Sequence, residues 1–322
     1  MIKENDLVIG THGRSIWILD DFSALRELTN LENKPHLFEP SLATRVRDNM
    51  FGDTPLPPEE PTGQNPPDGA IIDYYLPSEA DEIVLQIWNS EKKLINEFKS
   101  SDHVKRPDST SLPHPTYWIR PIQKLSKKKG HQRFIWNLRY SNPKGAKQGY
   151  AIAAVQHNTP ISPKGPFVAP DIYTIKLIVN GKSWEQEIRV RIDPRVKTSE
   201  ADIELQSKLS LQTYNAYNEL YQLRLKAKDY LKNKGDDKEM QKLFTKYVSD
   251  KNPSNGDQLY GSIQFTAFED ETIVGLQEKL LHTLVVLQAS DERPTEATKA
   301  TVDELLDIQK IFIEEWEKVI SK

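Results

Sequence analysis

The chain has 322 residues, 43 of them basic and 47 acidic, and its net charge of −4 argues against nucleic acid or an anionic membrane surface as a partner. Cysteine is absent, which excludes disulfides, thiolate metal sites and cysteine nucleophiles, and the length suggests two or three domains. No apolar run reaches the roughly 20 residues of a membrane-spanning helix, so no membrane span is predicted, and residues 1–6 lack the apolar core of a signal peptide.

The first predicted elements are two short strands joined by a tight turn. Residues 7–9 and 16–19 are apolar runs, and the polar residues 11–15 between them contain a glycine, so together they indicate a β-hairpin. Because both strands are continuously apolar, we expect burial on both faces. A lone hairpin is barely stable in water, so we expect this one to pack on the rest of the chain or on a further sheet. A short helical pattern follows at residues 20–28.

A proline-rich stretch ends this N-terminal region, which we place at residues 1–50. Residues 37–38 and 43–47 in that region are candidate edge strands. In residues 51–69, repeated prolines fix backbone angles and remove amide donors. This stretch is therefore predicted to be a surface loop or linker.

Residues 70–196 are predicted to form a small antiparallel β-sandwich. In the run from Gly130 to Tyr140, Phe134, Trp136 and Leu138 alternate with mostly polar residues, as in a strand with one buried face. Other stretches show the same two-residue period. The predicted strands are residues 73–76, 83–88, 94–98, 134–140, 172–179 and 184–192, and Asn180-Gly181 is predicted to be the hairpin turn between the last two.

Residues 197–322 are predicted to be helical, because the apolar period changes to three or four residues. Ser199, with Asp202 three residues later, resembles a capping box. We expect helices at about residues 199–233, 240–248, 273–287 and 294–319, with a loop at residues 249–262. Their apolar stripes should pack together as an antiparallel helical bundle, which makes the whole chain a multidomain α+β protein.

Residues 6–28, DLVIGTHGRSIWILDDFSALREL, resemble the closing blade of large bacterial β-propeller proteins, those of the BNR-repeat glycosyl hydrolase and sortilin-like VPS10 family. The likeness continues in the same order through residues 65–70, 133–140 and 170–195 and covers essentially the whole chain. The Ser-x-Asp-x-Gly-x-Thr-Trp repeat of such propellers, the Asp-box, is absent, so the repeats that would carry an active site are missing.

The resemblance implies an architecture and a setting for the chain. Residues 1–50 would be the remnant of a propeller blade with its linker strands, and residues 70–196 an immunoglobulin- or fibronectin-like sandwich. The chain would be the C-terminal part of a longer protein, and an upstream β-propeller of the same polypeptide would be its partner. For full-length relatives the resemblance implies export to the periplasm or the cell exterior.

Two sets of polar residues are candidate sites. His12 and Arg14 share the tight turn, where Arg14 could clamp a carboxylate or sulfate; hydrogen bonding within the turn or to a neighbouring blade is the favoured alternative. A glycosidase needs two carboxyls that flank the scissile bond, and Asp68 and Asp73 border the proline-rich loop and could line a groove. A turn role for Asp68 is the favoured alternative. The adjacent pair Asp20-Asp21 suits helix capping better than catalysis.

Aromatic residues and histidines complete the candidates. Tyr117, Trp118 and Tyr150 lie in irregular segments, where they could stack on sugar rings, although packing at the edge of the core is the favoured role. The histidines lack the short spacing of metal ligands, and no Gly-x-Ser-x-Gly or glycine-rich phosphate loop occurs, so neither a metal site nor a cofactor is predicted.

The first functional hypothesis is therefore a non-catalytic C-terminal module that braces a propeller or engages a partner protein. The alternative is a sialidase-like glycoside hydrolase whose active site lies mostly in an upstream propeller. Carbohydrate is a further candidate ligand in either case.

Overall fold

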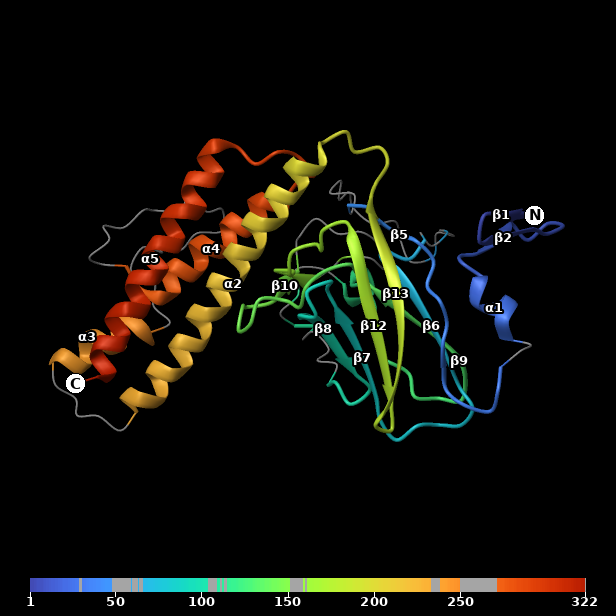
Figure 1. Ribbon diagram of the computed structural model, residues 1–322, viewed down its shortest axis with the longest axis horizontal. Helices are drawn as coiled ribbons and strands as arrows, with labels where there is room; N and C mark the ends of the chain where they lie inside the picture. The colour runs from blue at the N-terminus through green and yellow to red at the C-terminus, as the bar shows by residue number, and fades with distance from the viewer. Residues whose placement is uncertain are drawn as a thin grey trace. The chain divides into compact units, whose positions relative to one another are not determined.

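The computed structural model shows a chain of mixed α and β structure with a helical C-terminal region (Figure 1). It describes residues 1–28, 31–47, 59, 63, 66–103, 109–110, 112, 115–150, 159, 161–232, 238–249 and 271–321. Most of the predicted loops at residues 51–69 and 249–262 therefore lies outside the described residues. The chain divides into two compact units, one of Met1–Ser141, Gln148–Lys164 and Val168–Val196, the other of Asn142–Lys147, Gly165–Phe167 and Lys197–Lys322.

The first unit begins with a small antiparallel sheet, which we call the N-terminal sheet. Its strands are β1 (Ile2–Lys3), β2 (Asp6–Gly10) and β3 (Ile16–Leu19), in that order. The short helix α1 (Ser23–Glu27) follows. The predicted hairpin is confirmed, but the expectation that both of its faces are buried is wrong. All four residues of β3 are exposed, because no other part of the described chain covers them.

Two larger sheets follow in the same unit. The three-stranded sheet has the order β4 (His36–Leu37), β6 (Ala70–Leu76) and β9 (Gly130–Trp136). The five-stranded sheet has the order β5 (Ala43–Arg45), β13 (Lys182–Ile192), β12 (Asp171–Val179), β7 (Ile83–Trp88) and β8 (Leu94–Lys99). All pairs are antiparallel except β13 with β5. β10 (Gly149–Tyr150) and β11 (Ile161–Ser162) pair with each other and form a separate two-stranded sheet.

The apolar faces of the two larger sheets meet in one core. Trp136 on β9 packs edge-on against Tyr173 on β12, with ring centroids 5.6 Å apart, and Phe98 on β8 lies 4.7 Å from Phe134 on β9. Alternate residues along β6, β7 and β12 are buried, as the two-residue period predicted. Burial of apolar surface contributes about 25 cal/mol per Å², so these faces stabilise the unit.

The predicted strand at residues 134–140 differs from the observed one. β9 spans Gly130–Trp136 and ends there, because Leu138 adopts a left-handed backbone with φ of +55°. The turn is held by the Trp136 indole, which donates to the Arg139 carbonyl oxygen at 3.2 Å. Leu138 is nevertheless buried. Its apolar character therefore reflects a place in the core rather than a place in the strand.

The second unit is built from four helices. They are α2 (Glu200–Leu231), α3 (Lys238–Tyr247), α4 (Ile273–Leu287) and α5 (Glu296–Ile320), and Figure 1 shows α2, α4 and α5 side by side. Ser199, Thr272 and Thr295 each accept a hydrogen bond from a backbone amide three residues later and so cap α2, α4 and α5. No helix in the described part of the chain has the length and apolar character needed to cross a bilayer.

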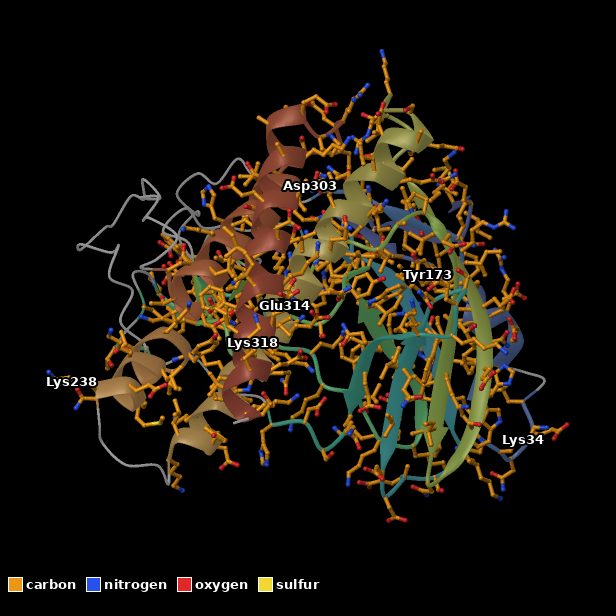
Figure 2. The ribbon with its side chains drawn as sticks, turned by 60° about the vertical axis from the view of Figure 1, so that its left-hand side comes forward. Lys34, Tyr173, Lys238, Asp303, Glu314 and Lys318 are labelled. Atoms are coloured by element: carbon orange, nitrogen blue, oxygen red, sulfur yellow. The ribbon has the colours of Figure 1, made fainter. Side chains whose placement is uncertain are left out.

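The helices pack with alternating direction. Gln288 at the end of α4 donates to Ser210 near the start of α2, whereas Gln277 near the start of α4 reaches Tyr217 further along α2, so these two helices are antiparallel. α5 runs parallel to α2, since Gln309 donates to Glu219 while Val302 packs on Leu209. Charged side chains such as Asp303, Glu314 and Lys318 lie on the exposed face of α5 (Figure 2).

Two segments that precede residue 197 in the sequence belong to the helical unit. Lys144 donates its backbone N–H to the Asn218 side chain on α2 at 2.9 Å, and Phe167 donates its own to Gln288 at 2.9 Å. Gly145 has a φ of +69°, and a Cβ atom there would collide with the ring of Tyr221. This approach of backbone to ring requires glycine.

Candidate functional site

The first candidate pair, His12 and Arg14, lies in the turn between β2 and β3 and is exposed to solvent. The turn itself is held by other groups. The Thr11 hydroxyl donates to the Ser15 carbonyl oxygen at 2.8 Å, and the Trp17 indole donates to the Arg14 carbonyl oxygen at 3.1 Å. Within the described residues, neither the His12 nor the Arg14 side chain has a hydrogen-bond partner. The Arg14 guanidinium is therefore available to an external anion.

The strand that follows this turn is the most exposed apolar element of the described chain. Ile16 is 69% exposed, Trp17 65%, Ile18 60% and Leu19 40%. Successive residues of a strand point to opposite faces, so both faces of β3 present large apolar groups to solvent. Ile9 on the neighbouring strand β2 is 48% exposed and extends this surface. We call these five side chains the apolar surface of the N-terminal sheet.

A half-buried arginine connects the chain segment after β3 to the three-stranded sheet. Arg133 on β9 donates from Nε and Nη2 to the two carboxylate oxygens of Asp73 on β6, both at 2.9 Å. Its Nη1 and Nη2 also donate to the carbonyl oxygens of Asp20 and Asp21, at 2.6 and 2.5 Å. Such a bidentate pair fixes geometry as well as charge. We call Asp73, Arg133 and the carbonyls of Asp20 and Asp21 the arginine anchor.

His131 also approaches the carboxylate of Asp73, which is buried. The distance from His131 Nε2 to Asp73 Oδ1 is 3.2 Å, an ion pair when the imidazole is protonated. Burial acts to raise the pKa of Asp73, but the neighbouring His131 and Arg133 outweigh it and hold that pKa below its usual value. A general acid needs a raised pKa. Asp73 therefore acts as a structural anion, which argues against the acid role in a glycosidase pair.

Asp68 is engaged separately. Its Oδ2 accepts from Arg120 Nη2 at 2.7 Å. Arg120 follows the 3₁₀ turn Thr116–Trp118, in which Tyr117 and Trp118 lie edge to face with ring centroids 6.3 Å apart. The structure therefore brings Asp68 into the region of the two candidate aromatics, whereas Asp68 and Asp73 each bind an arginine of their own. No shared carboxylate pair forms between them.

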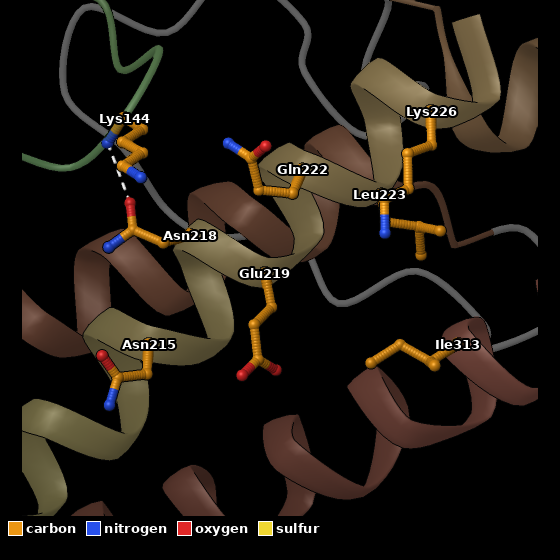
Figure 3. Close-up of a pocket in the computed structure, with 8 residues that line it drawn as sticks. All are labelled: Lys144, Asn215, Asn218, Glu219, Gln222, Leu223, Lys226 and Ile313. Carbon is orange, nitrogen blue, oxygen red and sulfur yellow. Dashed lines mark hydrogen bonds between the residues drawn. The ribbon is translucent and has the colours of Figure 1, made fainter. Parts of the chain in front are cut away.

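A shallow hollow of about 430 Å³ lies in the helical unit (Figure 3). Most of its lining is the polar, exposed face of α2, and Glu219 is held there by Gln309 at 2.6 Å. The lining residues are Lys144, Asn215, Asn218, Glu219, Gln222, Leu223, Lys226 and Ile313. The lining holds no histidine, cysteine or serine and only one carboxylate, that of Glu219.

We also searched the described part of the chain for a cluster of side chains that could bind a metal ion. The described residues contain no group of three or more His, Asp or Glu side chains that could hold a metal ion. The sequence did not indicate Arg133 and His131 as the partners of Asp73. Only the β6–β9 register, which places Asp73 directly opposite Arg133, identifies that pair.

Comparison with known protein families found no family model that matches the chain, and a search of curated proteins found no matching relative.

Proposed function

We propose that this chain is a non-catalytic structural and interaction module, which docks to its partner through the N-terminal sheet. The observation that carries the proposal is the exposure of every residue of β3, Ile16–Leu19, on both faces. An isolated large side chain at a surface is ordinary, whereas a contiguous apolar patch on a soluble protein is typical of an interaction site. Burial of such a side chain contributes about 1.5–3 kcal/mol, so a covering partner would gain several such increments.

The arginine anchor supports this role because it ties the docking element to the rest of its unit. Arg133 binds the backbone carbonyls of Asp20 and Asp21, which come directly after β3. Asn5, which lies at the same end of the sheet, donates to Ser41 at 3.0 Å. A rigidly presented surface loses less conformational freedom on binding.

The proposed partner is a β-propeller of the BNR-repeat glycosyl hydrolase or sortilin-like VPS10 kind. The support is the resemblance of residues 6–28 to a closing blade, together with a sheet that is apolar on both faces, as a sheet between two others would be. The resemblance also leads us to propose that the two facing sheets are an immunoglobulin- or fibronectin-like sandwich that braces this partner. Upstream coding sequence with Asp-box repeats would support this choice of partner.

Catalysis by the chain alone is tested with aryl glycosides. We expect no turnover, because Asp68 and Asp73 are bound to separate arginines and Asp73 has a lowered pKa. Turnover that disappears in both Asp68→Ala and Asp73→Ala, with Asp193→Ala as the control for an unrelated carboxylate, would overturn the non-catalytic assignment and favour a glycoside hydrolase whose site includes residues of this chain.

Docking is tested with a hydrophobic fluorescent dye. We expect the wild-type chain to bind the dye and the double variant Trp17→Ser/Ile18→Ser to lose most of that binding, because these two side chains are more than half exposed. Leu225→Ser on α2, which removes an exposed leucine elsewhere, is the matched control and should keep it. Equal dye binding by all three proteins would contradict the proposal that the N-terminal sheet is the docking surface.

A further inference from the structure

We propose that β3 pairs antiparallel with β3 of a second copy of this chain, with Trp17 on the two-fold axis. The inference rests on the proposed docking role of the N-terminal sheet. It states that, in a solution of the chain alone, the partner is a second copy. It follows from the orientation of the backbone at the outer edge of β3, from the absence of edge protection and from the charges that flank the strand.

The outer edge of β3 presents unpaired backbone groups. Val8 exchanges both hydrogen bonds of its backbone with Met1, donating at 2.8 Å and accepting at 2.8 Å, so Val8 faces β1. Ile18 is opposite Val8 in the register and therefore belongs to a pair without hydrogen bonds between β2 and β3. Because this alternation continues, Ile16 also directs its N–H and C=O away from β2. These four groups can accept a further strand.

β3 also lacks the features that prevent edge pairing in natural sheets. Charged residues, proline or a bulge on the edge strand normally discourage another strand from joining. β8, an edge of the five-stranded sheet, carries Glu97 and Lys99. Its pairing with β7 also shifts register between Ile87 and Trp88, as at a bulge. β3 has the sequence Ile-Trp-Ile-Leu, with no charge and no proline. Strand addition at such an edge is a recurring mode of protein recognition.

The backbone directions select one register for pairing with a second copy. Hydrogen bonds form only if outward-facing residues oppose each other, so Ile16 of one copy pairs with Ile18 of the other, and the reverse. Trp17 then lies opposite Trp17 of the second copy in a pair without hydrogen bonds, where side chains come closest. Aromatic pairs across strands stabilise a sheet by about 0.2–1 kcal/mol each.

The same register brings opposite charges together. It places Arg14 of each copy toward Asp20 of the other, at both ends of the strand. Arg14 has no ionic partner among the described residues. The pKa of Asp20 is raised, first by burial and then by the nearby carboxylate of Asp6, although Arg133 acts to lower it. A cation from a second copy would relieve this repulsion, so the charges and the backbone favour one arrangement.

A disulfide test reports the register directly, because the chain contains no cysteine of its own. In Trp17→Cys the two Cα atoms would be about 4.5 Å apart, within the range that a disulfide spans. Leu19→Cys is the matched control on the same face of β3, and its two sulfurs would be separated by roughly 13 Å along the strands. Under mild oxidation we expect a covalent dimer of Trp17→Cys and little or none of Leu19→Cys. Equal cross-linking of both variants, or none of Trp17→Cys, would overturn the proposal.

A charge exchange tests the pairing of Arg14 with Asp20 by sedimentation velocity over a concentration series. The free edge is four residues long, so we expect weak association, of the class that buries less than about 1,200 Å². Arg14→Asp alone and Asp20→Arg alone should be monomeric, because each places like charges at both ends. Their mixture should dimerise, because the aspartate introduced in one variant then meets the arginine introduced in the other, and this recovery also shows that both variants are folded.

The outcomes separate this inference from the proposed function. A wild-type chain that stays monomeric, or a dimer that is insensitive to both charge changes, overturns the pairing of β3 with itself. Neither result alters the dye binding by which docking of the N-terminal sheet is tested. Equal dye binding by the wild type and both variants contradicts the proposed function whatever the oligomeric state.

Discussion

Asp73 shows how one buried charge is held by two side chains of the neighbouring strand β9. Its carboxylate is 5% exposed and meets Arg133 and His131, both on the neighbouring strand. The sequence placed Asp73 among candidate catalytic residues because acidic residues near a loop are ambiguous without a register. The register shows that its partner is a cation rather than a second carboxylate.

We expect Asp73→Asn to lower the free energy of unfolding by about 2–3 kcal/mol, somewhat less than the ~3–5 kcal/mol for breaking a fully buried pair, because Arg133 is 25% exposed. The substitution leaves the guanidinium without its counter-charge. Urea unfolding measures the loss. Asp68→Asn is the matched control: its carboxylate is 41% exposed, so we expect less than about 1 kcal/mol. Equal losses of unfolding free energy in the two variants would show that the burial of Asp73 does not increase its contribution to stability.

Acid sensitivity should depend on Asp193. Hydrogen bonds from the Arg195 side chain and backbone lower the pKa of this carboxylate to about 2. A lowered folded-state pKa stabilises the protein above the unfolded pKa of about 3.9, and this stabilisation is lost as the pH falls toward 2. We expect wild type to be more stable than Asp193→Asn at pH 5 and the difference to vanish between about pH 4 and pH 2. A difference that stays constant over this range in denaturant titrations would contradict the assignment.

Gly69 is a position that only glycine suits. Its φ is +140°, and a Cβ atom would collide with the carbonyl oxygen of Trp136. We expect Gly69→Ala to cost more than the ~1–3 kcal/mol of backbone strain alone. Gly130→Ala is the control, because Gly130 also has a positive φ, of +100°, but open space around its Cβ position. Similar unfolding midpoints for the two variants would show that the collision is relieved at little cost.

At the scale of single elements, the sequence predicts strands well and their surroundings poorly. The two-residue period identified β7, β12 and β13 because alternate residues face a core. For β3 the same apolar residues predicted burial, yet Ile16–Leu19 is exposed. Apolar residues show that a strand would be stabilised by burial, but the sequence does not show whether another part of the chain covers that strand. Leu138 is a further case, since it is buried but lies beyond the end of β9.

The two strand tryptophans should therefore respond differently to truncation. Trp136 is fully buried, and we expect Trp136→Ala to cost about 3–5 kcal/mol through the cavity it leaves. Trp17 is 65% exposed, and we expect Trp17→Ala to change stability by no more than about 0.5 kcal/mol in dilute solution. Thermal or urea unfolding at low protein concentration compares them. A large loss for Trp17→Ala would mean that the chain itself covers β3.

At the scale of the whole molecule, the helices and the Ser199 cap were readable from the sequence, whereas membership of the two units was not. Ser199 caps α2 as the pattern predicted. Residues 142–147 and 165–167 carry no helical signal, yet they pack on α2 and α4. Such long-range contacts depend on tertiary packing, which a local pattern does not encode.

The sequence likewise indicated some features of the candidate site and not others. Arg14 and the exposed run after it were recognisable as residue types, because a lone arginine in a tight turn and an apolar hairpin are both local patterns. The arginine anchor and the outward direction of the Ile16 and Ile18 backbone depend on which strands pair and in which register. These pairings join residues far apart in the sequence, so they could not be predicted from it.

Amide hydrogen exchange over a concentration series tests most directly that the outer edge of β3 is open and pairs with β3 of a second copy. In dilute solution, we expect the amides of Ile16 and Ile18 to exchange rapidly, while those of the central strand β7 remain protected. At high concentration the Ile16 and Ile18 amides should become protected as well. Protection of both amides already at high dilution, or rapid exchange at every concentration, would contradict the account.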